Sequence, residues 1–218
     1  MKVLHIACYS TKDPIPILEK NISKLNKKIC LVTIAQHLDQ LPKVKKFLEK
    51  NDKEVFVGGQ ILGCDQSKTT EFRDKAGCFL YIGSGKFHPL AISLRTEQPV
   101  FVLNPISQDF YKISDEEKVK WEKKNRGRIS RAIGAEIFGI LISTKSGQFN
   151  LRGGLSIKKN IEKIGKKAFL FAGEQINPEN VLPFKVDAWI NTACPRIVDD
   201  FFDRPILNPD ELKFVMEN

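Results

Sequence analysis

The chain has 218 residues, of which 42% are hydrophobic, and it carries a formal net charge of +9. This length and composition suit one large globular domain or two small ones, and no apolar run approaches the roughly 20 residues that a membrane-spanning helix needs. The cysteine count is odd, at five, and the apolar run at residues 3–8 is too short for a signal peptide, so we expect a cytoplasmic protein without disulfides or a membrane anchor.

The first half of the chain alternates between short apolar runs and segments with helical spacing. Apolar runs rich in β-forming residues occupy residues 3–7, 29–34, 54–57, 78–82 and 100–103. Apolar residues recur at helical spacing between them, at residues 14–27, 39–50 and 87–95. Strands that alternate with helices are typical of a parallel sheet that is covered on both faces.

A long charged segment, residues 114–133, follows this half. Ser114 and Glu117 match a capping box at the start of a helix. The alternation then resumes, with strands expected at 137–142, 168–171 and 187–190 and helices at 154–164 and after residue 209. We therefore predict an α/β protein with two related parallel-sheet domains and flanking helices, residues 1–112 and 113–218, in which a long helix joins the two.

Two cysteines in loops, Cys64 and Cys194, are the most informative residues. Each follows an apolar stretch and lies in a segment that fits neither helix nor strand, GGQILGCD at 58–65 and NTACPR at 191–196. A thiol in a loop at a strand end is placed to reach a ligand. The other three cysteines lie in or beside strand-like runs, where buried side chains are expected: Cys8, Cys30 and Cys78.

A soft metal centre shared by the two halves is one interpretation of Cys64 and Cys194. The sequence has no CxxC pair and no cysteine-histidine cluster at zinc spacing. An iron-sulfur cluster normally takes four thiolates, so two cysteines would leave ligand positions to be filled. A catalytic thiol and a structural cysteine stay open as alternatives.

Further candidate loops lie at expected strand ends, where open parallel sheets bind ligands. Residues 83–89 (GSGKFHP) read as strand, glycine turn and helix, and their amides would suit a carboxylate or phosphate, although the segment is neither a P-loop nor a full dinucleotide fingerprint. Arg196, two residues after Cys194, could bind an anion through bidentate hydrogen bonds. His37, at the end of a strand, and His88, in the first turn of a helix, fit either a site or a structural role.

Lysine and arginine gather in three segments, residues 43–53, 118–131 and 158–167. Basic segments suit an anionic partner, either nucleic acid or an acidic protein, and they equally suit the solvated faces of lysine-rich helices. Few aromatic residues are interleaved with these charges, so the pattern does not favour direct nucleic-acid binding.

Taken together, the loops resemble those of the diphthamide synthase family, the archaeal 2-(3-amino-3-carboxypropyl)histidine synthases. The resemblance rests on segments that follow the family's order: TIAQHL at 33–38, GQILGCD at 59–65, YIGSGKFHPL at 81–90, LNP at 103–105, STKSGQ at 143–148, TACPR at 192–196 and RPILNP at 204–209. It therefore covers nearly the whole chain, and the combination is specific although each segment alone is not.

The resemblance implies three related α/β domains that each supply one cysteine to a [4Fe-4S] cluster, whose fourth iron binds S-adenosylmethionine. Reductive cleavage of S-adenosylmethionine then gives a 3-amino-3-carboxypropyl radical, which attacks a histidine of translation elongation factor 2 in the first step of diphthamide biosynthesis. By motif match, Cys64 would be the second-domain ligand and Cys194 the third-domain ligand. Residues that would help to hold S-adenosylmethionine are Gly83, Ser84, Gly85 and His88, with Gln36, His37, Gln148 and Arg196 as further candidates.

One departure from the family pattern is large. The sequence begins where the family's second domain begins, so the first domain and its cysteine are expected from elsewhere, and Cys8 and Cys30 match no family cysteine motif. A separate polypeptide or second subunit could supply that domain and give a split enzyme. The chain could also be a fragment of a longer protein, or a non-catalytic subunit or scaffold of a synthase complex. Outside this family, a nucleotide-binding module with reactive cysteines is the alternative.

Overall fold

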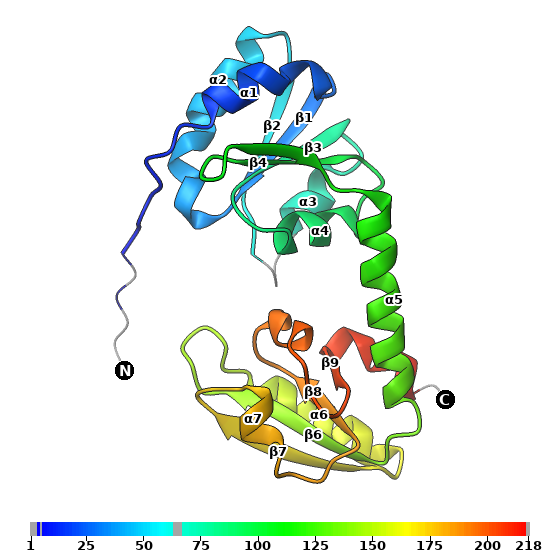
Figure 1. The fold of residues 1–218 in the computed structure, drawn as a ribbon. Coiled ribbons are helices and arrows are strands. Elements are labelled where there is room, and N and C mark those ends of the chain that lie inside the picture. The colour runs from blue at the N-terminus through cyan, green and yellow to red at the C-terminus, as the bar shows by residue number, and fades with distance from the viewer. Residues whose placement is uncertain (1–3, 5, 63–66, 217–218) are drawn as a thin grey trace. The chain divides into compact units, whose positions relative to one another are not determined.

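The computed structural model describes residue 4, residues 6–62 and residues 67–216 of the chain. The chain divides into two compact units, Met1–Lys120 and Trp121–Asn218. Each unit has a β-sheet with helices on its faces (Figure 1). Within the described ranges, no helix combines the length and the apolar character that crossing a lipid bilayer requires.

The first unit has a five-stranded sheet in the order β2-β1-β3-β4-β5. Its strands are β1 (Lys28–Thr33), β2 (Glu54–Gln60), β3 (Cys78–Ile82), β4 (Val100–Asn104) and β5 (Asp109–Lys112). The first four run parallel, and β5 pairs antiparallel with β4 at the edge. Strand β3 is buried along its whole length, as expected for a central strand of a sheet that is covered on both faces.

Helices cover both faces of this sheet. They are α1 (Ile15–Asn21), α2 (Leu41–Lys50), α3 (Ser67–Phe72) and α4 (Phe87–Ser93), with short 3₁₀ helices η1 (Ile22–Lys24) and η2 (Ala35–Gln40). Apolar residues of α1 and α2 pack with Leu31 and Leu80 on one face. Ile92 of α4 packs with Val32 and Tyr81 on the other, because successive strand residues point to opposite faces.

The second unit has a four-stranded parallel sheet in the order β7-β6-β8-β9. Its strands are β6 (Ile137–Ser143), β7 (Lys167–Gly173), β8 (Ala188–Asn191) and β9 (Ile206–Leu207), and its helices are α6 (Leu151–Lys163), α7 (Pro178–Val181), α8 (Lys213–Met216) and the 3₁₀ helices η3 (Pro195–Asp199) and η4 (Pro209–Glu211). Apolar residues of α6 and α8 pack on one face, and those of α7 and η3 pack on the other.

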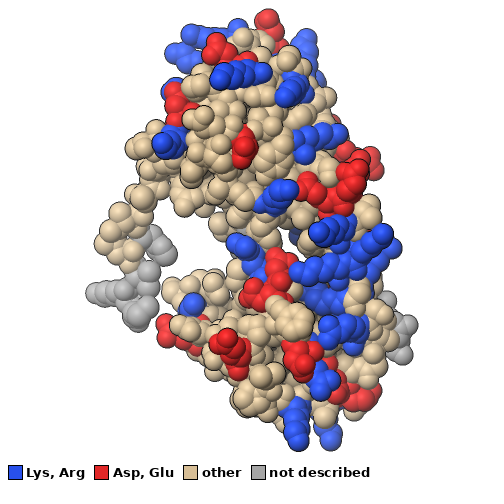
Figure 2. All heavy atoms as spheres, viewed as in Figure 1, with Lys and Arg blue, Asp and Glu red and all other residues tan. Residues whose placement is uncertain are grey.

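The long helix α5 (Asp115–Ala132) begins at the predicted capping box. The Glu117 backbone N–H donates to Ser114 Oγ at 3.2 Å, and the Ser114 N–H donates to Glu117 Oε2 at 3.1 Å, so each side chain satisfies a donor that the helix start leaves unpaired. At its other end, Ile129 and Ala132 join the apolar core of the second unit. Figure 2 shows basic side chains gathered along this helix on the viewed face.

The predicted α/β class with parallel sheets is confirmed, but the predictions for residues 3–8 are wrong. The strand expected at residues 3–7 is not formed by its described residues, and Leu4 and Ile6 are 82% and 81% exposed. An apolar run forms a strand only beside a hydrogen-bonding neighbour, and this segment is instead joined to the unit where the Ser10 N–H donates to the Gln36 carbonyl at 2.8 Å. Cys8, which directly follows residues 3–7, is exposed rather than buried.

Strand β5 was not expected from the sequence. Its burial is only partial, so it lacks the apolar run that marks the central strands. It forms because the chain turns back directly after β4, with Gln108 in the left-handed region at φ 62°. Antiparallel pairing needs only a short turn, and an edge strand does not require a fully apolar sequence.

Candidate functional site

The loop that carries Cys194 begins where β8 ends. Asn191 is the last residue of β8, and η3 starts at Pro195. Cys194 stands between them with an extended backbone, and its carbonyl accepts the N–H of Ile197 at 3.0 Å. Proline fits the first position of a helical turn because no hydrogen bond is lost there. The half-buried Cys194 therefore lies at the carboxyl edge of a parallel sheet, where such folds bind ligands.

Two buried polar residues fix this loop. Asn191 is 1% exposed, and its Nδ2 donates to the carbonyl of Cys194 at 2.9 Å while its Oδ1 accepts the N–H of Ala193 at 3.0 Å. The backbone N–H and the hydroxyl of Thr192 both donate to the carbonyl of Leu141 in β6, at 3.1 and 2.8 Å. The loop is therefore held both to itself and to the neighbouring strand.

A second layer of polar contacts lies behind Asn191. Its Nδ2 also donates to Asn208 Oδ1 at 3.0 Å. Asn208 and Glu211 form a capping box at η4, and Glu211 accepts a hydrogen bond from Arg128 of α5 at 2.6 Å. The Arg128 and Glu211 side chains are only 13% and 9% exposed. These residues were not predicted from the sequence, although the spacing of Asn208 and Glu211 is the signal of a capping box.

Cys64 lies outside the described residues, so the predicted convergence of Cys64 and Cys194 stays a prediction. Before that segment, the chain leaves β2 at its carboxyl edge, where the Ile61 N–H donates to the carbonyl of Thr33 at 2.8 Å. Gly58 lies within β2, and a Cβ there would stand 2.8 Å from Val32 Cγ1. Its role is close strand packing, and Gly58 is not part of the loop that the sequence predicted at residues 58–65.

The loop of Gly83, Ser84 and Gly85 follows β3 at the same edge of the first unit. Gly83 has φ 154°, and a Cβ there would stand 2.6 Å from the Tyr81 hydroxyl, so this backbone requires glycine. The Tyr81 hydroxyl donates to the Ser84 carbonyl at 3.3 Å. His88 is half-buried and stacks on the Tyr81 ring, with 6.0 Å between ring centroids.

Lys86, in the same loop, contacts the start of α5. Its Nζ lies 2.5 Å from Glu117 Oε1 and 5.7 Å from the centroid of the Tyr111 ring. The hydrogen bond from Lys86 and the backbone hydrogen bond from Ser114 hold the pKa of Glu117 below its ordinary value. Glu117 therefore both caps α5 and connects this helix to the glycine loop.

Gln36 and His37 lie in η2, directly after β1. His37 is 1% exposed, and its Nδ1 lies 3.3 Å from Gln40 Oε1. Gln40 Nε2 donates to the carbonyls of Ser10 and Lys12 at 2.8 and 2.9 Å, which leaves Oε1 as its acceptor and makes Nδ1 the donor of the His37 contact. Gln36 has an exposed side chain. Because β1 pairs with β3, these residues share an edge of the sheet with the glycine loop.

In the second unit, Gln148 and Arg196 reach the same edge as Cys194. Gln148 lies in the loop after β6 and is half-buried, and its N–H donates to the carbonyl of Lys145 at 3.1 Å. Arg196 is exposed on η3. Strands β6 and β8 are neighbours, so the loops that follow them lie at one edge. Each unit thus gathers its own set of predicted residues at the carboxyl edge of its sheet.

The described cysteines differ in whether they can act as ligands. Cys30 and Cys78 are fully buried, and burial raises their thiol pKa values to about 12 and about 11. They stay protonated at neutral pH, and the thiolate is the form that binds metal. Cys194, in contrast, is only half-buried, and cysteine side chains are the usual ligands of iron-sulfur clusters. Among the described residues, no group of three histidine, cysteine or acidic side chains could hold a metal ion.

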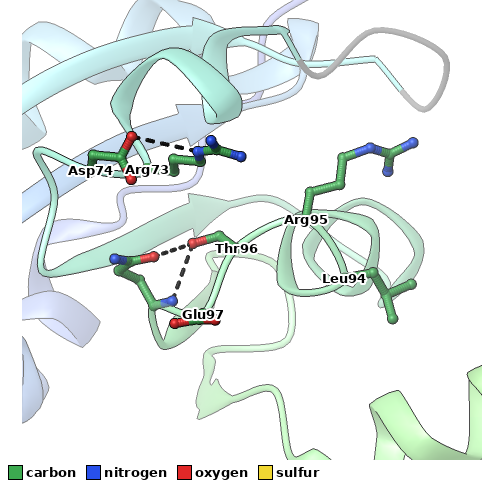
Figure 3. Close-up of a pocket in the computed structure, with 7 residues that line it drawn as sticks. Arg73, Asp74, Leu94, Arg95, Thr96 and Glu97 are labelled. Atoms are coloured by element: carbon green, nitrogen blue, oxygen red, sulfur yellow. Dashed lines mark hydrogen bonds and ion pairs between the residues drawn. The ribbon is translucent and has the colours of Figure 1, made fainter.

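A cavity of about 450 Å³ lies elsewhere in the first unit. It is lined by residues before β3 and β4: Arg73, Asp74, Leu94, Arg95, Thr96, Glu97 and Gln98. Arg73 is paired with Asp74 (Figure 3), with 3.5 Å between Nε and Oδ2. The Gln98 N–H donates to Thr96 Oγ1 at 3.1 Å. The cavity lies at the amino edge of the sheet, the edge opposite to the one that carries the loop of Gly83.

Comparison with known proteins decides the family. The family model for diphthamide synthesis proteins matches residues 1–218. The chain belongs to this diphthamide synthesis family. The resemblance inferred from the loops is therefore confirmed.

The similar proteins include two from archaea and one from an animal. The 2-(3-amino-3-carboxypropyl)histidine synthase of Pyrococcus horikoshii is 32% identical and is matched over 98% of this chain and 65% of that protein. The synthase of Methanocaldococcus jannaschii is 34% identical, over 88% of this chain and 53% of that protein. Subunit 1 of the synthase of Caenorhabditis elegans is 28% identical, over 88% and 51%. The chain therefore spans half to two thirds of these diphthamide synthases.

A solved structure of the family shares the fold. The crystal structure of Dph2 from Pyrococcus horikoshii with a 4Fe-4S cluster matches with a TM-score of 0.86 and 31% identity, over 96% of this chain and 64% of that one. At this identity and score, the likeness extends to the order and packing of the elements in this diphthamide synthesis protein.

Proposed function

We propose that the chain acts in the first step of diphthamide biosynthesis, as the part of a 2-(3-amino-3-carboxypropyl)histidine synthase that carries Cys64 and Cys194. The observation that carries the proposal is the match of the whole chain to the family, together with a structural relative that contains a 4Fe-4S cluster. The geometry of the Cys194 loop supports it, because that loop presents a half-buried thiol at the carboxyl edge of its sheet.

In this proposal, residues 1–112 correspond to the family's second domain and residues 113–218 to its third. Cys64 and Cys194 are ligands of a [4Fe-4S] cluster, and a third thiolate comes from a first domain on a separate polypeptide or second subunit. When bound, the cluster supplies the electron for reductive cleavage of S-adenosylmethionine. The group transferred is 3-amino-3-carboxypropyl, and its acceptor is a histidine of translation elongation factor 2 in the cytoplasm.

The chain's own residues position these groups. Asn191 and Thr192 hold the backbone of the Cys194 loop through hydrogen bonds. The Cys194 thiol is then the group of this loop that would bind iron. Gly83, Ser84, Gly85 and His88 are proposed to hold S-adenosylmethionine, with Gln36, His37, Gln148 and Arg196 around it. The stacking of His88 on Tyr81 fixes the plane of the imidazole ring, so a hydrogen bond from that ring would have a defined direction.

A transfer assay tests this function. The chain, prepared without oxygen and supplied with the first domain of the Pyrococcus relative, is mixed with a reductant, S-adenosylmethionine and archaeal elongation factor 2. We expect the labelled 3-amino-3-carboxypropyl group to appear on the factor. Cys64→Ala and Cys194→Ala should abolish transfer, whereas Cys8→Ala, a change at an exposed cysteine outside the family segments, should leave it unchanged. Transfer that survives either loop substitution would contradict the proposal.

A non-catalytic subunit or scaffold is the second candidate. It is favoured by one observation, that the chain spans about half of a relative described as subunit 1 of a synthase. A scaffold would bind a full-length synthase and, when purified with it without oxygen, would add no iron to the amount that the synthase holds by itself. Iron that depends on Cys194 in the same complex would rule out this candidate.

A further inference from the structure

Both polar groups of the Asn191 side-chain amide are hydrogen-bonded. Its Nδ2 donates to two acceptors, the carbonyl of Cys194 at 2.9 Å and Asn208 Oδ1 at 3.0 Å, and its Oδ1 accepts the N–H of Ala193 at 3.0 Å. The residue is 1% exposed, so water cannot replace these partners. A buried side chain with every group paired fixes the backbone around it.

The contact with Cys194 has a directional consequence. The carbonyl of Cys194 is held by Asn191 Nδ2 and by the N–H of Ile197, while Asn191 Oδ1 accepts the N–H of Ala193, which belongs to the Thr192–Ala193 peptide, one before the peptide that enters Cys194. With the peptide after Cys194 held at its carbonyl and the chain before it held at the N–H of Ala193, the direction of the Cα–Cβ bond of Cys194 is restricted. We propose that Asn191 is the positioning residue that aims the Cys194 thiol, an inference that rests on the proposed function of that thiol as a cluster ligand.

The position of Asn191 is itself fixed from behind. Asn208 Oδ1 accepts from Asn191, and the Asn208 N–H donates to Glu211 Oε2 at 2.8 Å. Glu211 Oε1 lies 2.6 Å from Arg128 Nη2, and Arg128 Nη1 donates to the carbonyl of Ile206 at 2.8 Å. Charge-assisted contacts of this kind are strong and directional when water is excluded. A continuous chain of contacts therefore connects the Cys194 loop to helix α5.

Only an amide of this length can make the contacts of Asn191. Aspartate has the same shape but no donors, so its carboxylate would face the Cys194 carbonyl and Asn208 Oδ1 with acceptors only. The same substitution at Asn208 should keep its contact with Asn191, because Asn208 takes part in that contact only as an acceptor, through its Oδ1. Asn208→Asp keeps an acceptor there, and aspartate is also a good helix cap. Asn191→Asp and Asn208→Asp are therefore a matched pair with opposite expected results.

The experiment measures how fast iodoacetamide alkylates each cysteine of the folded chain, at one fixed pH, by peptide mass spectrometry. With Asn191→Asp, we expect Cys194 to react about fivefold faster or more, because the loop that half-buries it is no longer held. Cys78, fully buried in the first unit, should keep its rate, and so should Cys194 in Asn208→Asp. Tryptophan fluorescence checks the fold of the second unit, since Trp121 and Trp189 both lie there.

The proposal is overturned if Cys194 in folded Asn191→Asp reacts within about twofold of the wild-type rate, or if Asn208→Asp raises the rate as much as Asn191→Asp does. The limit is about twofold because the loss of a single buried hydrogen bond should raise the population of the open loop about a few-fold. If Asn191→Asp does not fold, Asn208→Ala replaces it. This change removes one acceptor of Asn191, and we expect Cys194 to react about threefold faster; an unchanged rate there overturns the proposal too.

Iron content separates this inference from the proposed function. The same variants are given ferrous iron and sulfide without oxygen, in complex with the first domain of the Pyrococcus relative, and retained iron is counted per chain. If wild type holds no iron while the alkylation rates respond as expected, the cluster function fails and the positioning role of Asn191 stands. If wild type holds iron and Asn191→Asp matches it in both iron and alkylation, the positioning role alone fails.

Discussion

The four described cysteines occupy different environments, and their chemistry differs accordingly. Cys8 is exposed, Cys194 is half-buried in a loop that Asn191 and Thr192 hold, and Cys30 and Cys78 are fully buried within the sheet. The sequence predicted burial correctly for Cys30 and Cys78, because their strands are continuous apolar runs. It was wrong for Cys8, because an apolar run does not reveal whether a neighbouring strand exists. Asn191 was not singled out, since its partners at 193, 194 and 208 become visible only in three dimensions.

The buried thiol of Cys30 predicts a pH dependence of stability. Its pKa is raised to about 12 in the folded chain by burial, whereas an exposed thiol has a pKa near about 8.5. Below that lower value both states keep the proton. Between about pH 9 and pH 12 only the unfolded chain loses it, so the free energy of unfolding falls as pH rises, by at most about 1.4 kcal/mol per pH unit for one thiol.

Urea unfolding followed by circular dichroism at pH 8 and pH 10.5 checks this. The decrease in stability should be about 2–3 kcal/mol smaller in Cys30→Ala than in wild type. Cys8→Ala is the control, because Cys8 is exposed, and it should lose stability as wild type does. Equal losses in Cys30→Ala and wild type would show that this thiol ionises in the folded state.

At the scale of elements, the sequence predicted most strands and the start of the long helix, because these depend on local signals. Apolar runs marked β1, β3, β4 and β6, and the pair Ser114 and Glu117 marked the cap of α5. Strand β5 and the 3₁₀ helices η2 and η3 were missed, since such elements depend on turn geometry, as the positive φ of Gln108 before β5 shows. Strand β2 extends through Gly58 and Gly59, where glycine suggested a loop. Here tertiary packing against β1 overrides local preference.

The cap of α5 should be worth more than the ion pair beside it. Ser114→Ala removes the acceptor of the Glu117 N–H, and we expect the free energy of unfolding to fall by about 1 kcal/mol. Lys86→Ala removes an ion pair whose lysine side chain is 65% exposed, and its effect should be smaller than that of Ser114→Ala, because water screens an exposed pair. Urea unfolding measures both, and a larger loss in Lys86→Ala than in Ser114→Ala would contradict this ranking.

Strand β6 contains a glycine that the packing of Trp189 requires. A Cβ on Gly139 would stand 2.2 Å from Cζ3 of Trp189, so Gly139→Ala should destabilise the second unit by about 1–3 kcal/mol or more through overpacking. The control is Gly127→Ala in helix α5, where a Cβ meets no atom within 4 Å. This change should raise the free energy of unfolding by about 0.5–1 kcal/mol, because alanine favours a helix more than glycine does. Tryptophan fluorescence during urea unfolding reports both, and a neutral Gly139→Ala would show that the ring can move aside.

At the scale of the whole molecule, some of the basic side chains make contacts within the protein. Three cations of α5 at helical spacing donate to backbone carbonyls after the Cys194 loop: Lys124 to Asp199 at 3.3 Å, Arg128 to Ile206 at 2.8 Å and Arg131 to Asp203 at 3.0 Å. Side chains three and four residues apart share a helix face. This face of α5 therefore holds the segment 199–206 in place, and the sequence pattern alone, which suggested a solvated face or a docking surface, did not show it.

The chain spans 65% of the Pyrococcus protein, and the proposed cluster needs a further thiolate from a first domain. Two thiolates leave a cluster poorly held, because its retention depends on ligation and on burial by the surrounding protein. We therefore expect the chain alone to lose iron readily and the complex with a first domain to keep it.

Iron content measured without oxygen in that complex tests most directly whether Cys64 and Cys194 hold one cluster. We predict iron and acid-labile sulfide in wild type and in Cys8→Ala, and near-complete loss in Cys64→Ala and in Cys194→Ala alike. Full retention of iron by Cys194→Ala, or by Cys64→Ala, would contradict a shared cluster.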